Sequence, residues 1–211
     1  MEALILVDVQ NDFVPSGALA VPAGNEVVPV ANRLMTSFEL VFATQDWHPA
    51  NHGSFASQHP GRVVGDVVDL NGLEQHLWPD HCVQGTPGAA FIDSLDTSRL
   101  TGIIRKGMDP GVDSYSGFFD NGHRQATGLG EALTERGVRD VYLVGLATDY
   151  CVKFTALDAA KLGFRTSLVP EGVRGVEVQA GDCERSIEEI RAAGVSMVHA
   201  ETVMQRQQRP L

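Results

Sequence analysis

Three side chains that could perform chemistry follow short apolar runs of the sequence: Asp8, Lys106 and Cys151. An aspartate can act as a general base and a cysteine as a nucleophile, while a lysine stabilises the negative charge that develops during the reaction. If the three runs are parallel strands of one sheet, their carboxyl ends bring these side chains to the same edge. Each residue alone is also compatible with packing or a surface contact, but together they predict one nucleophilic site.

Cys151 lies between a predicted strand and a predicted helix that Thr148 or Asp149 could cap. In the first helical turn its sulfur would lie near the positive end of the helix dipole and near free N–H groups. Both features lower the pKa of a thiol, and the N–H groups can also hold an oxyanion. We therefore expect a thiol with a lowered pKa. Cys82 and Cys183 are the alternative nucleophiles, and three widely spaced cysteines argue against a disulfide framework.

A second group of residues has the composition of a metal site. Asp46 and His48 are two residues apart and can point toward one ion, and His81 follows in a proline-containing turn. One carboxylate and two imidazoles, with the remaining positions open to water, suit Zn²⁺, Fe²⁺ or Mn²⁺ in a catalytic site. His52 and His59 compete as ligands, because they lie in the same histidine-rich stretch.

Three aromatic residues stand close in sequence to these groups: Phe13, Trp78 and Tyr115. Each could simply pack in the core or in a loop. If Phe13 lies beside Asp8 and Trp78 lies beside His81, however, the rings could hold a flat aromatic substrate through offset or edge contacts. We therefore treat the three as candidate substrate-binding residues.

The elements that must position these residues alternate between strands and helices. Short apolar runs predict six buried strands, at Ala3 to Val9, Leu40 to Thr44, Gly102 to Arg105, Val141 to Leu146, Thr166 to Val169 and Ser196 to His199. Apolar residues at helical spacing predict four helices, at Asn25 to Phe38, Gly128 to Arg136, Asp149 to Leu162 and Ala180 to Ala193. This alternation predicts an α/β fold in which helices cover both faces of a mostly parallel sheet.

Two segments depart from that alternation. The stretch from Trp47 to Gly88 holds five of the seven histidines and little helical periodicity, which predicts a long functional loop excursion. The polar end from Gln205 to Leu211 predicts a frayed terminus. No linker-like segment is present, so we expect residues 1–211 to form a single domain.

The composition limits the class of partner. The chain has 211 residues, and 16 Lys and Arg against 27 Asp and Glu give a formal net charge of -11. We therefore expect no nucleic-acid partner and no anionic membrane surface. No apolar run approaches the roughly 20 residues of a membrane span, and the first residues lack the features of a signal peptide. These observations predict a cytoplasmic protein.

Five sequence blocks carry a resemblance to a known family. They are Asp8 to Phe13, Gln45 to Phe55, Trp78 to Val83, Asp113 to Phe118 and Gly145 to Phe154. In this order they closely resemble the bacterial nicotinamidases, which belong to the isochorismatase-like cysteine hydrolases. The resemblance runs from Ala3 to Gly175, whereas the segment from Val176 onward is generic.

The resemblance implies a fold, a reaction and a set of reacting groups. The fold is a Rossmann-like three-layer sandwich with a mostly parallel central sheet, the isochorismatase-like hydrolase fold. The reaction is hydrolysis of nicotinamide to nicotinate and ammonia through a cysteine thioester, in NAD salvage, with pyrazinamide as a further substrate. The triad falls on Asp8, Lys106 and Cys151. The N–H groups of Ala147 and Cys151 form the oxyanion hole, with a cis peptide bond before Ala147.

The resemblance also implies a cofactor. One divalent metal ion, with Zn²⁺ expected and Fe²⁺ or Mn²⁺ as alternatives, would be held by Asp46, His48 and His81 and would bind the pyridine nitrogen. Family members vary at a further metal-shell position six residues after the first histidine, which is Ser54 in this chain. A serine is a weak neutral ligand and could act through water. The expected partner is the small molecule nicotinamide, and the chain is expected to be a monomer or a homodimer.

Three other functions compete with this one. Another cysteine hydrolase of the superfamily could act on a ureido, carbamoyl or other small amide, but those relatives commonly lack the metal set. A non-catalytic binding module would most simply lack a member of the triad, and none is missing. A nucleotide-binding protein would carry a glycine-rich loop after the first strand, where Gln10 to Asp12 stand instead.

Overall fold

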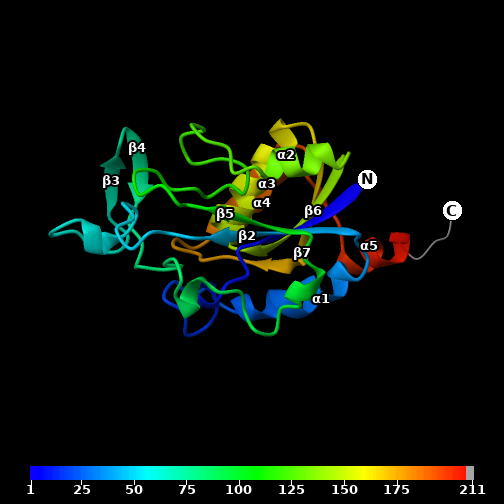
Figure 1. Ribbon diagram of the computed structural model, residues 1–211, viewed down its shortest axis with the longest axis horizontal. Helices are drawn as coiled ribbons and strands as arrows, with labels where there is room; N and C mark the ends of the chain where they lie inside the picture. Colours follow the sequence, from blue (N-terminus) through cyan, green and yellow to red (C-terminus); the bar gives the residue numbers. More distant parts are fainter. Residues whose placement is uncertain (208–211) are drawn as a thin grey trace.

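A six-stranded, all-parallel sheet forms the centre of the computed structural model, which describes residues 1–207 (Figure 1). The strand order is β5-β2-β1-β6-β7-β8. The strands are β1 (Glu2–Val7), β2 (Leu40–Asp46), β5 (Gly102–Lys106), β6 (Asp140–Leu146), β7 (Arg165–Arg174) and β8 (Ser196–Met197). Because every neighbouring pair is parallel, all six carboxyl ends face the same edge.

Helices cover both faces of this sheet, as the sequence predicts. The residues from Ala3 to Val7 of β1 have no exposed surface, which explains why the strand is apolar throughout rather than alternating. Leu4 and Leu6 contribute to the core under α1 (Val27–Met35) and α5 (Ala200–Gln207). The alternate residues of β1 contribute to the core on the other face, under α2 (Leu129–Glu135), α3 (Lys153–Lys161) and α4 (Asp182–Ala192). The three-layer α/β prediction is confirmed.

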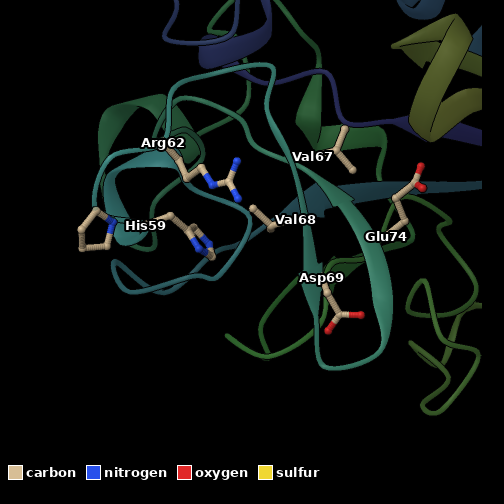
Figure 2. A pocket seen from close by; sticks show the side chains of 7 residues that line it. His59, Arg62, Val67, Val68, Asp69 and Glu74 are labelled. Carbon is tan, nitrogen blue, oxygen red and sulfur yellow. The ribbon is translucent and has the colours of Figure 1, made fainter.

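A small antiparallel hairpin lies within the predicted loop excursion, away from the main sheet (Figure 1). Its strands are β3 (Val67–Leu70) and β4 (Leu73–His76). Asn71 and Gly72 join them with positive φ values of 53° and 84°, which is typical of a two-residue Asn-Gly hairpin turn. Figure 2 shows an open hollow beside the hairpin, lined in part by Val67, Val68 and Glu74. The hairpin was absent from the predicted elements.

Two strand boundaries differ from the prediction for local reasons. β1 ends at Val7 rather than Val9, because Asp8 adopts the left-handed conformation with φ of 47°. β7 does not end at Val169 but continues through Pro170 to Arg174. Its pairing with β6 shifts in register between Leu143 and Gly145, and such irregularities are where a sheet accepts a proline.

The carboxyl-terminal half differs in three further places. The segment predicted to begin a helix at Asp149 first forms a π-helical turn, Thr148–Val152, and the α-helix begins at Lys153. β8 is shorter than predicted, and α5 was not predicted. Helix α5 extends to Gln207, so the prediction of a frayed end from Gln205 is wrong for its first three residues, while 208–211 lie outside the described residues. The prediction that the strand beginning at Gly102 is buried is also wrong, because β5 lies at the edge of the sheet and Ile103 is 49% exposed. The remaining predicted elements differ only at their ends. None of the helices between residues 1 and 207 has the length and apolar character needed to cross a membrane.

Gly145 provides a test of how closely β1 and β6 approach each other. Its φ is 125°, and a Cβ atom at this position would lie 2.0 Å from the carbonyl oxygen of Val7. We expect Gly145→Ala to lower the free energy of unfolding by about 2–4 kcal/mol, measured by urea denaturation. Gly130→Ala in α2 is the control, because the added Cβ meets nothing closer than 3.6 Å. A Gly145→Ala protein as stable as the Gly130→Ala control would contradict the close approach.

Candidate functional site

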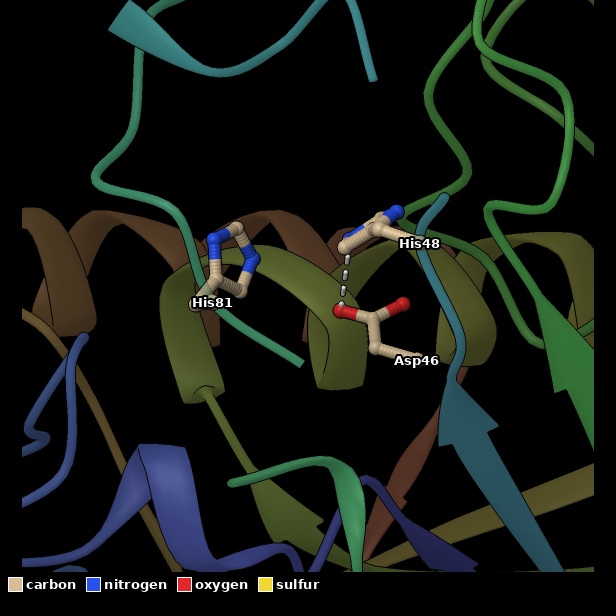
Figure 3. A group of neighbouring side chains, drawn as sticks. All are labelled: Asp46, His48 and His81. Atoms are coloured by element: carbon tan, nitrogen blue, oxygen red, sulfur yellow. Dashed lines mark ion pairs between the residues drawn. The ribbon is translucent and has the colours of Figure 1, made fainter. Parts of the chain in front are cut away.

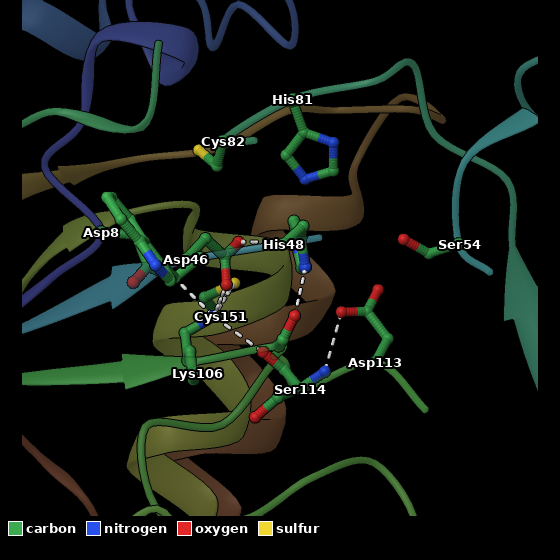
Figure 4. Close-up of polar contacts among 12 residues, drawn as sticks. Asp8, Asp46, His48, Ser54, His81, Cys82, Lys106, Asp113, Ser114 and Cys151 are labelled. Atoms are coloured by element: carbon green, nitrogen blue, oxygen red, sulfur yellow. Dashed lines mark hydrogen bonds and ion pairs between the residues drawn. The ribbon is translucent and has the colours of Figure 1, made fainter. Parts of the chain in front are cut away.

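The structure brings the three predicted reacting groups together at the carboxyl edge of the sheet (Figure 4). Lys106 Nζ lies 2.9 Å from Asp8 Oδ2 and 3.4 Å from Cys151 Sγ. The Cys151 sulfur, an Asp8 oxygen and an Asp46 oxygen lie within 4.8 Å of one another. All four residues are buried. The expected alternatives Cys82 and Cys183 are free thiols that take no part in this cluster.

Short contacts from neighbouring elements hold Asp8 in place. The Thr44 hydroxyl, on β2, donates to Asp8 Oδ1 at 2.6 Å and accepts from the Asp8 N–H at 3.1 Å. Asp8 Oδ2 lies beside Lys106 but has no well-aligned hydrogen-bond donor. That oxygen is therefore available to accept a proton from a neighbouring group. Sequence reasoning had assigned no role to Thr44, although it directly precedes a block that was singled out.

Burial and charge set the protonation states in this cluster. Burial raises the pKa of Asp8 to about 6, although Lys106 opposes the shift. Burial would lower the pKa of Lys106, but Asp46 and Asp8 raise it well above its ordinary value, so the ammonium persists. Burial also raises the pKa of Cys151 well above its ordinary value, with Asp8 and Asp46 adding to the shift and Lys106 opposing it.

The prediction of a Cys151 thiol with a lowered pKa is therefore wrong. The prediction assumed a sulfur near the free N–H groups of an α-helix's first turn, whereas Cys151 lies within a π-helical turn and its sulfur is buried beside two carboxylates. At neutral pH the group is a thiol, and a base must remove its proton before it can attack a carbonyl carbon.

The predicted metal ligands also converge (Figure 3). Potential ligand atoms of Asp46, His48 and His81 lie within 4.8 Å of one another. His48 Nδ1 lies 2.8 Å from the carbonyl oxygen of Gly107, and His81 Nδ1 lies 2.7 Å from that of Pro79. Because a carbonyl oxygen only accepts, both Nδ1 atoms carry the hydrogen in the neutral rings, and each Nε2 keeps its lone pair.

The Nε2 atom of His48 supports a metal at this place. It is buried without a hydrogen-bond partner, and it lies 3.6 Å from Asp46 Oδ2. A buried lone pair without a donor is costly unless an ion or a proton satisfies it. One carboxylate and two oriented imidazoles fit a single divalent metal ion with further positions open.

The competing ligand His52 has a different arrangement. Its Nδ1 accepts from the Ser54 hydroxyl at 2.7 Å and from the Ser54 N–H at 3.2 Å, so its hydrogen lies on Nε2 in the neutral ring. A nitrogen of His52, one of His48 and an oxygen of Asp113 do lie within 4.8 Å of one another, next to the predicted triplet. Ser54 is buried on the side of the site away from Asp8 (Figure 4). The other competitor, His59, lines the hollow beside the hairpin instead.

A cavity connects the nucleophile to the metal ligands. Its lining includes the three predicted aromatic residues, Phe13, Trp78 and Tyr115, as well as Cys151 and His81. Sequence reasoning had given no role to four further lining residues, which are Leu19, Asp113, Tyr150 and Val176. Asp113 and Tyr150 belong to blocks that carry the family resemblance, so a signal was present for them. The other two lie in loops without a distinctive pattern.

The backbone beside the nucleophile has the feature that the resemblance implies. The peptide bond between Leu146 and Ala147 is cis. Ala147 and Cys151 line the same cavity, and the N–H groups of Tyr150 and Val152 donate to the Ala147 carbonyl at 3.1 and 3.0 Å. The turn that carries the nucleophile is therefore tied to the end of β6.

Comparison with known proteins gives the family. The model of the Isochorismatase domain matches residues 2–202. The chain belongs to the isochorismatase family. Within this family it is 50% identical over 199 residues to the nicotinamidase of Escherichia coli K12, covering 92% of this chain and 93% of that protein.

Solved structures of family members show the same fold. A nicotinamidase/pyrazinamidase of Acinetobacter baumanii superposes with a TM-score of 0.92 at 43% identity, covering 96% of this chain and 97% of that one. A pyrazinamidase of Pyrococcus horikoshii in complex with zinc superposes with a TM-score of 0.77 at 40% identity, covering 94% and 98%. This chain is thus an isochorismatase-family protein along nearly its whole length.

Metal binding can be tested without an activity assay. We expect His48→Ala to lower the affinity for Zn²⁺ by at least about 100-fold, since a buried ligand is lost. Equilibrium dialysis followed by elemental analysis measures this directly. His59→Ala should leave the affinity unchanged, because His59 lies outside the predicted triplet. Equal zinc binding by both variants would contradict the ligand assignment.

Proposed function

We propose that the chain is a nicotinamidase, an amidohydrolase that converts nicotinamide and water to nicotinate and ammonia. The observation that carries this proposal is the buried cluster of Asp8, Lys106 and Cys151 opening into an aromatic cavity whose lining also includes Asp46 and His81. A cysteine nucleophile beside a carboxylate base suits acyl transfer. An aromatic cavity next to a metal site suits a flat ring with a basic nitrogen. The nicotinamidase relatives support the same reaction.

In the first half of the reaction, Asp8 accepts the proton of the Cys151 thiol and the sulfur attacks the carboxamide carbon. With a pKa of about 6, Asp8 is ionised at neutral pH and is more basic than an exposed aspartate. The N–H groups of Ala147 and Cys151 are the donors that we assign to the resulting oxyanion. Asp8 then gives its proton to the leaving nitrogen, ammonia departs, and a thioester remains on Cys151.

In the second half, Asp8 takes a proton from water, and the hydroxide attacks the thioester carbon. The C–S bond breaks, the proton on Asp8 returns to the Cys151 sulfur, and the acid product leaves and releases its carboxyl proton to solvent as nicotinate. Lys106 remains an ammonium throughout, because its contacts with two carboxylates raise its pKa. Its positive charge stabilises the transient thiolate, from which it lies 3.4 Å away.

Asp46, His48 and His81 would hold the metal, which when bound supplies a Lewis-acid contact for the pyridine nitrogen. We assign Zn²⁺ as the ion, with Fe²⁺ or Mn²⁺ as alternatives, and the zinc-containing pyrazinamidase neighbour supports this choice. Ser54 would act at most through water, because its neutral hydroxyl already donates to His52.

The cavity also favours a particular position for the substrate ring. Phe13, Trp78 and Tyr115 line the space between the metal ligands and Cys151. Rings at these places can hold a flat substrate with its carboxamide directed at the sulfur, which contributes orientation as well as affinity.

The proposal extends to the wider role of the protein. Pyrazinamide differs from nicotinamide only within the ring, so the same cavity and nucleophile serve both, and we place the reaction in NAD salvage. We further propose a single isochorismatase-like domain, with the excursion at 47–88 supplying His48, Trp78 and His81 to the site. A cytoplasmic location, a monomeric or homodimeric state and the absence of nucleic-acid or membrane partners stay predictions.

The nucleophile assignment has a direct test. Cys151→Ala should fold normally and lose essentially all release of ammonia from nicotinamide, because no other described group in the cavity can form the thioester. Cys183→Ala is the matched control and should keep most activity, since Cys183 lies outside the cavity. Substantial turnover by Cys151→Ala would favour attack by metal-bound hydroxide and overturn the mechanism.

The raised pKa of Asp8 predicts an acid limit to activity. As the pH falls through about 6, Asp8 takes up a proton and can no longer accept one from Cys151, so kcat/KM should fall about tenfold per pH unit below that value. The profile should be measured with bound metal quantified at each pH, because protonation of histidine ligands releases metal. A profile flat down to pH 5 with full metal occupancy would exclude Asp8 as the base.

A further inference from the structure

We propose that Gln75, on the β3–β4 hairpin, is a positioning residue that sets the aromatic wall of the substrate cavity. This inference rests on the proposed nicotinamidase function. Gln75 does not line the cavity, but its side chain contacts two residues that do, Asp113 and Tyr115. The hairpin would thus form part of the active-site architecture despite lying outside the central sheet.

The segment that carries Asp113 and Tyr115 lacks regular structure of its own. Between the end of β5 at Lys106 and the start of α2 at Leu129, the chain forms no helix or strand, only the isolated bridge between Phe119 and Ala126. Loops of this length in a compact fold need external contacts to hold one conformation. The position of the cavity wall therefore depends on what this loop touches.

The hairpin supplies such contacts at two places. At its tip, the Asn71 side chain donates to the Gly111 carbonyl at 2.8 Å, and Arg124 Nη2 donates to the Asn71 carbonyl at 2.9 Å. On β4, Gln75 is 2% exposed, and its amide nitrogen lies 3.0 Å from the Tyr115 hydroxyl and 3.2 Å from Asp113 Oδ2. The contacts of Asn71 hold the loop between β5 and α2, whereas the contacts of Gln75 reach two residues that line the cavity.

The Tyr115 hydroxyl joins Gln75 to the rest of the aromatic wall. Trp78 Nε1 lies 3.1 Å from the same hydroxyl. An indole N–H and an amide N–H can only donate, so the hydroxyl oxygen accepts from both. The rings of Trp78 and Tyr115 also meet the Tyr150 ring edge-on, with centroids 4.8 and 5.5 Å away. Gln75 therefore completes a network that fixes the relative orientation of three cavity rings.

Gln75 is suited to influence substrate binding rather than bond breaking. Its amide nitrogen contacts Asp113, Tyr115 and the His76 carbonyl, and none of its hydrogen bonds reaches Asp8, Lys106 or Cys151. Loss of its hydrogen bonds would leave the Tyr115 hydroxyl and the buried Asp113 carboxylate each short of a donor. The wall would then shift while the nucleophile kept its base, which predicts an effect on KM with little effect on kcat.

The experiment compares matched substitutions on the same strand. Gln75→Met keeps the length of the side chain and removes its donors, and we expect KM for nicotinamide to rise about 5- to 10-fold with kcat within about twofold of wild type. Glu74→Met introduces the same residue at the neighbouring exposed position of β4 and should leave both constants unchanged. If Gln75→Met fails to fold, Gln75→Asn, whose shorter amide cannot reach Tyr115, provides the same comparison.

A double-mutant cycle distinguishes positioning through Tyr115 from general loosening of the fold. Tyr115→Phe removes the shared acceptor, so KM of Gln75→Met/Tyr115→Phe should exceed that of Tyr115→Phe by less than about twofold. If the effects of the two substitutions on KM multiply in the double variant, or if KM is unchanged in the Gln75 variants, the proposal is overturned. Wild-type protein that releases no ammonia from nicotinamide would instead refute the proposed function, so the two failures are separable.

Discussion

The buried ammonium of Lys106 is the interaction on which the site depends. Removing a charge from water is costly, and it is tolerated only where opposite charges and hydrogen bonds replace the lost hydration. Here Asp8 lies 2.9 Å away, Asp46 forms a second ion pair, and the Ser114 carbonyl accepts a third contact at 2.7 Å. Because one cation contacts both carboxylates, the proposed base and the proposed metal ligand are electrostatically linked. Burial and the two carboxylates keep Cys151 a thiol until Asp8 takes its proton, although Lys106 opposes this shift in pKa.

The register of the parallel sheet makes this ammonium cluster possible. Asp46 and Lys106 are direct partners in the pairing of β2 with β5, and Val7, just before Asp8, is the partner of Gly145 on β6. Since β5, β2, β1 and β6 are consecutive in the sheet, their carboxyl ends place the reacting groups side by side. The loops that follow these strands supply the remaining side chains of the cavity.

The loops complete the cavity through contacts between segments distant in sequence. Trp78, in the excursion at 47–88, donates to the hydroxyl of Tyr115, which lies in the loop after β5. The Trp78 ring also meets the ring of Tyr150, which follows β6. The Asn-Gly pair at Asn71 and Gly72 is a hairpin signal in the sequence. The strands beside it are short and half-exposed, however, so their residues lack the apolar pattern that predicts a strand. A role for Gln75 could not be read from its sequence position, because both of its cavity partners lie in another loop.

The sequence by itself determined the layered α/β architecture, the edge at which chemistry occurs and the residue types that meet there. These follow from local pattern: continuous apolar runs make buried parallel strands, and the polar residues that end them must share one edge. Only the tertiary structure decided how these groups titrate and how the cavity is walled. The dipole argument for Cys151 considered only its own turn, whereas its pKa is set by burial, by the ammonium of Lys106 and by the carboxylates of Asp8 and Asp46. Burial and charge depend on every segment that surrounds an atom, and that information exists only after the chain has folded.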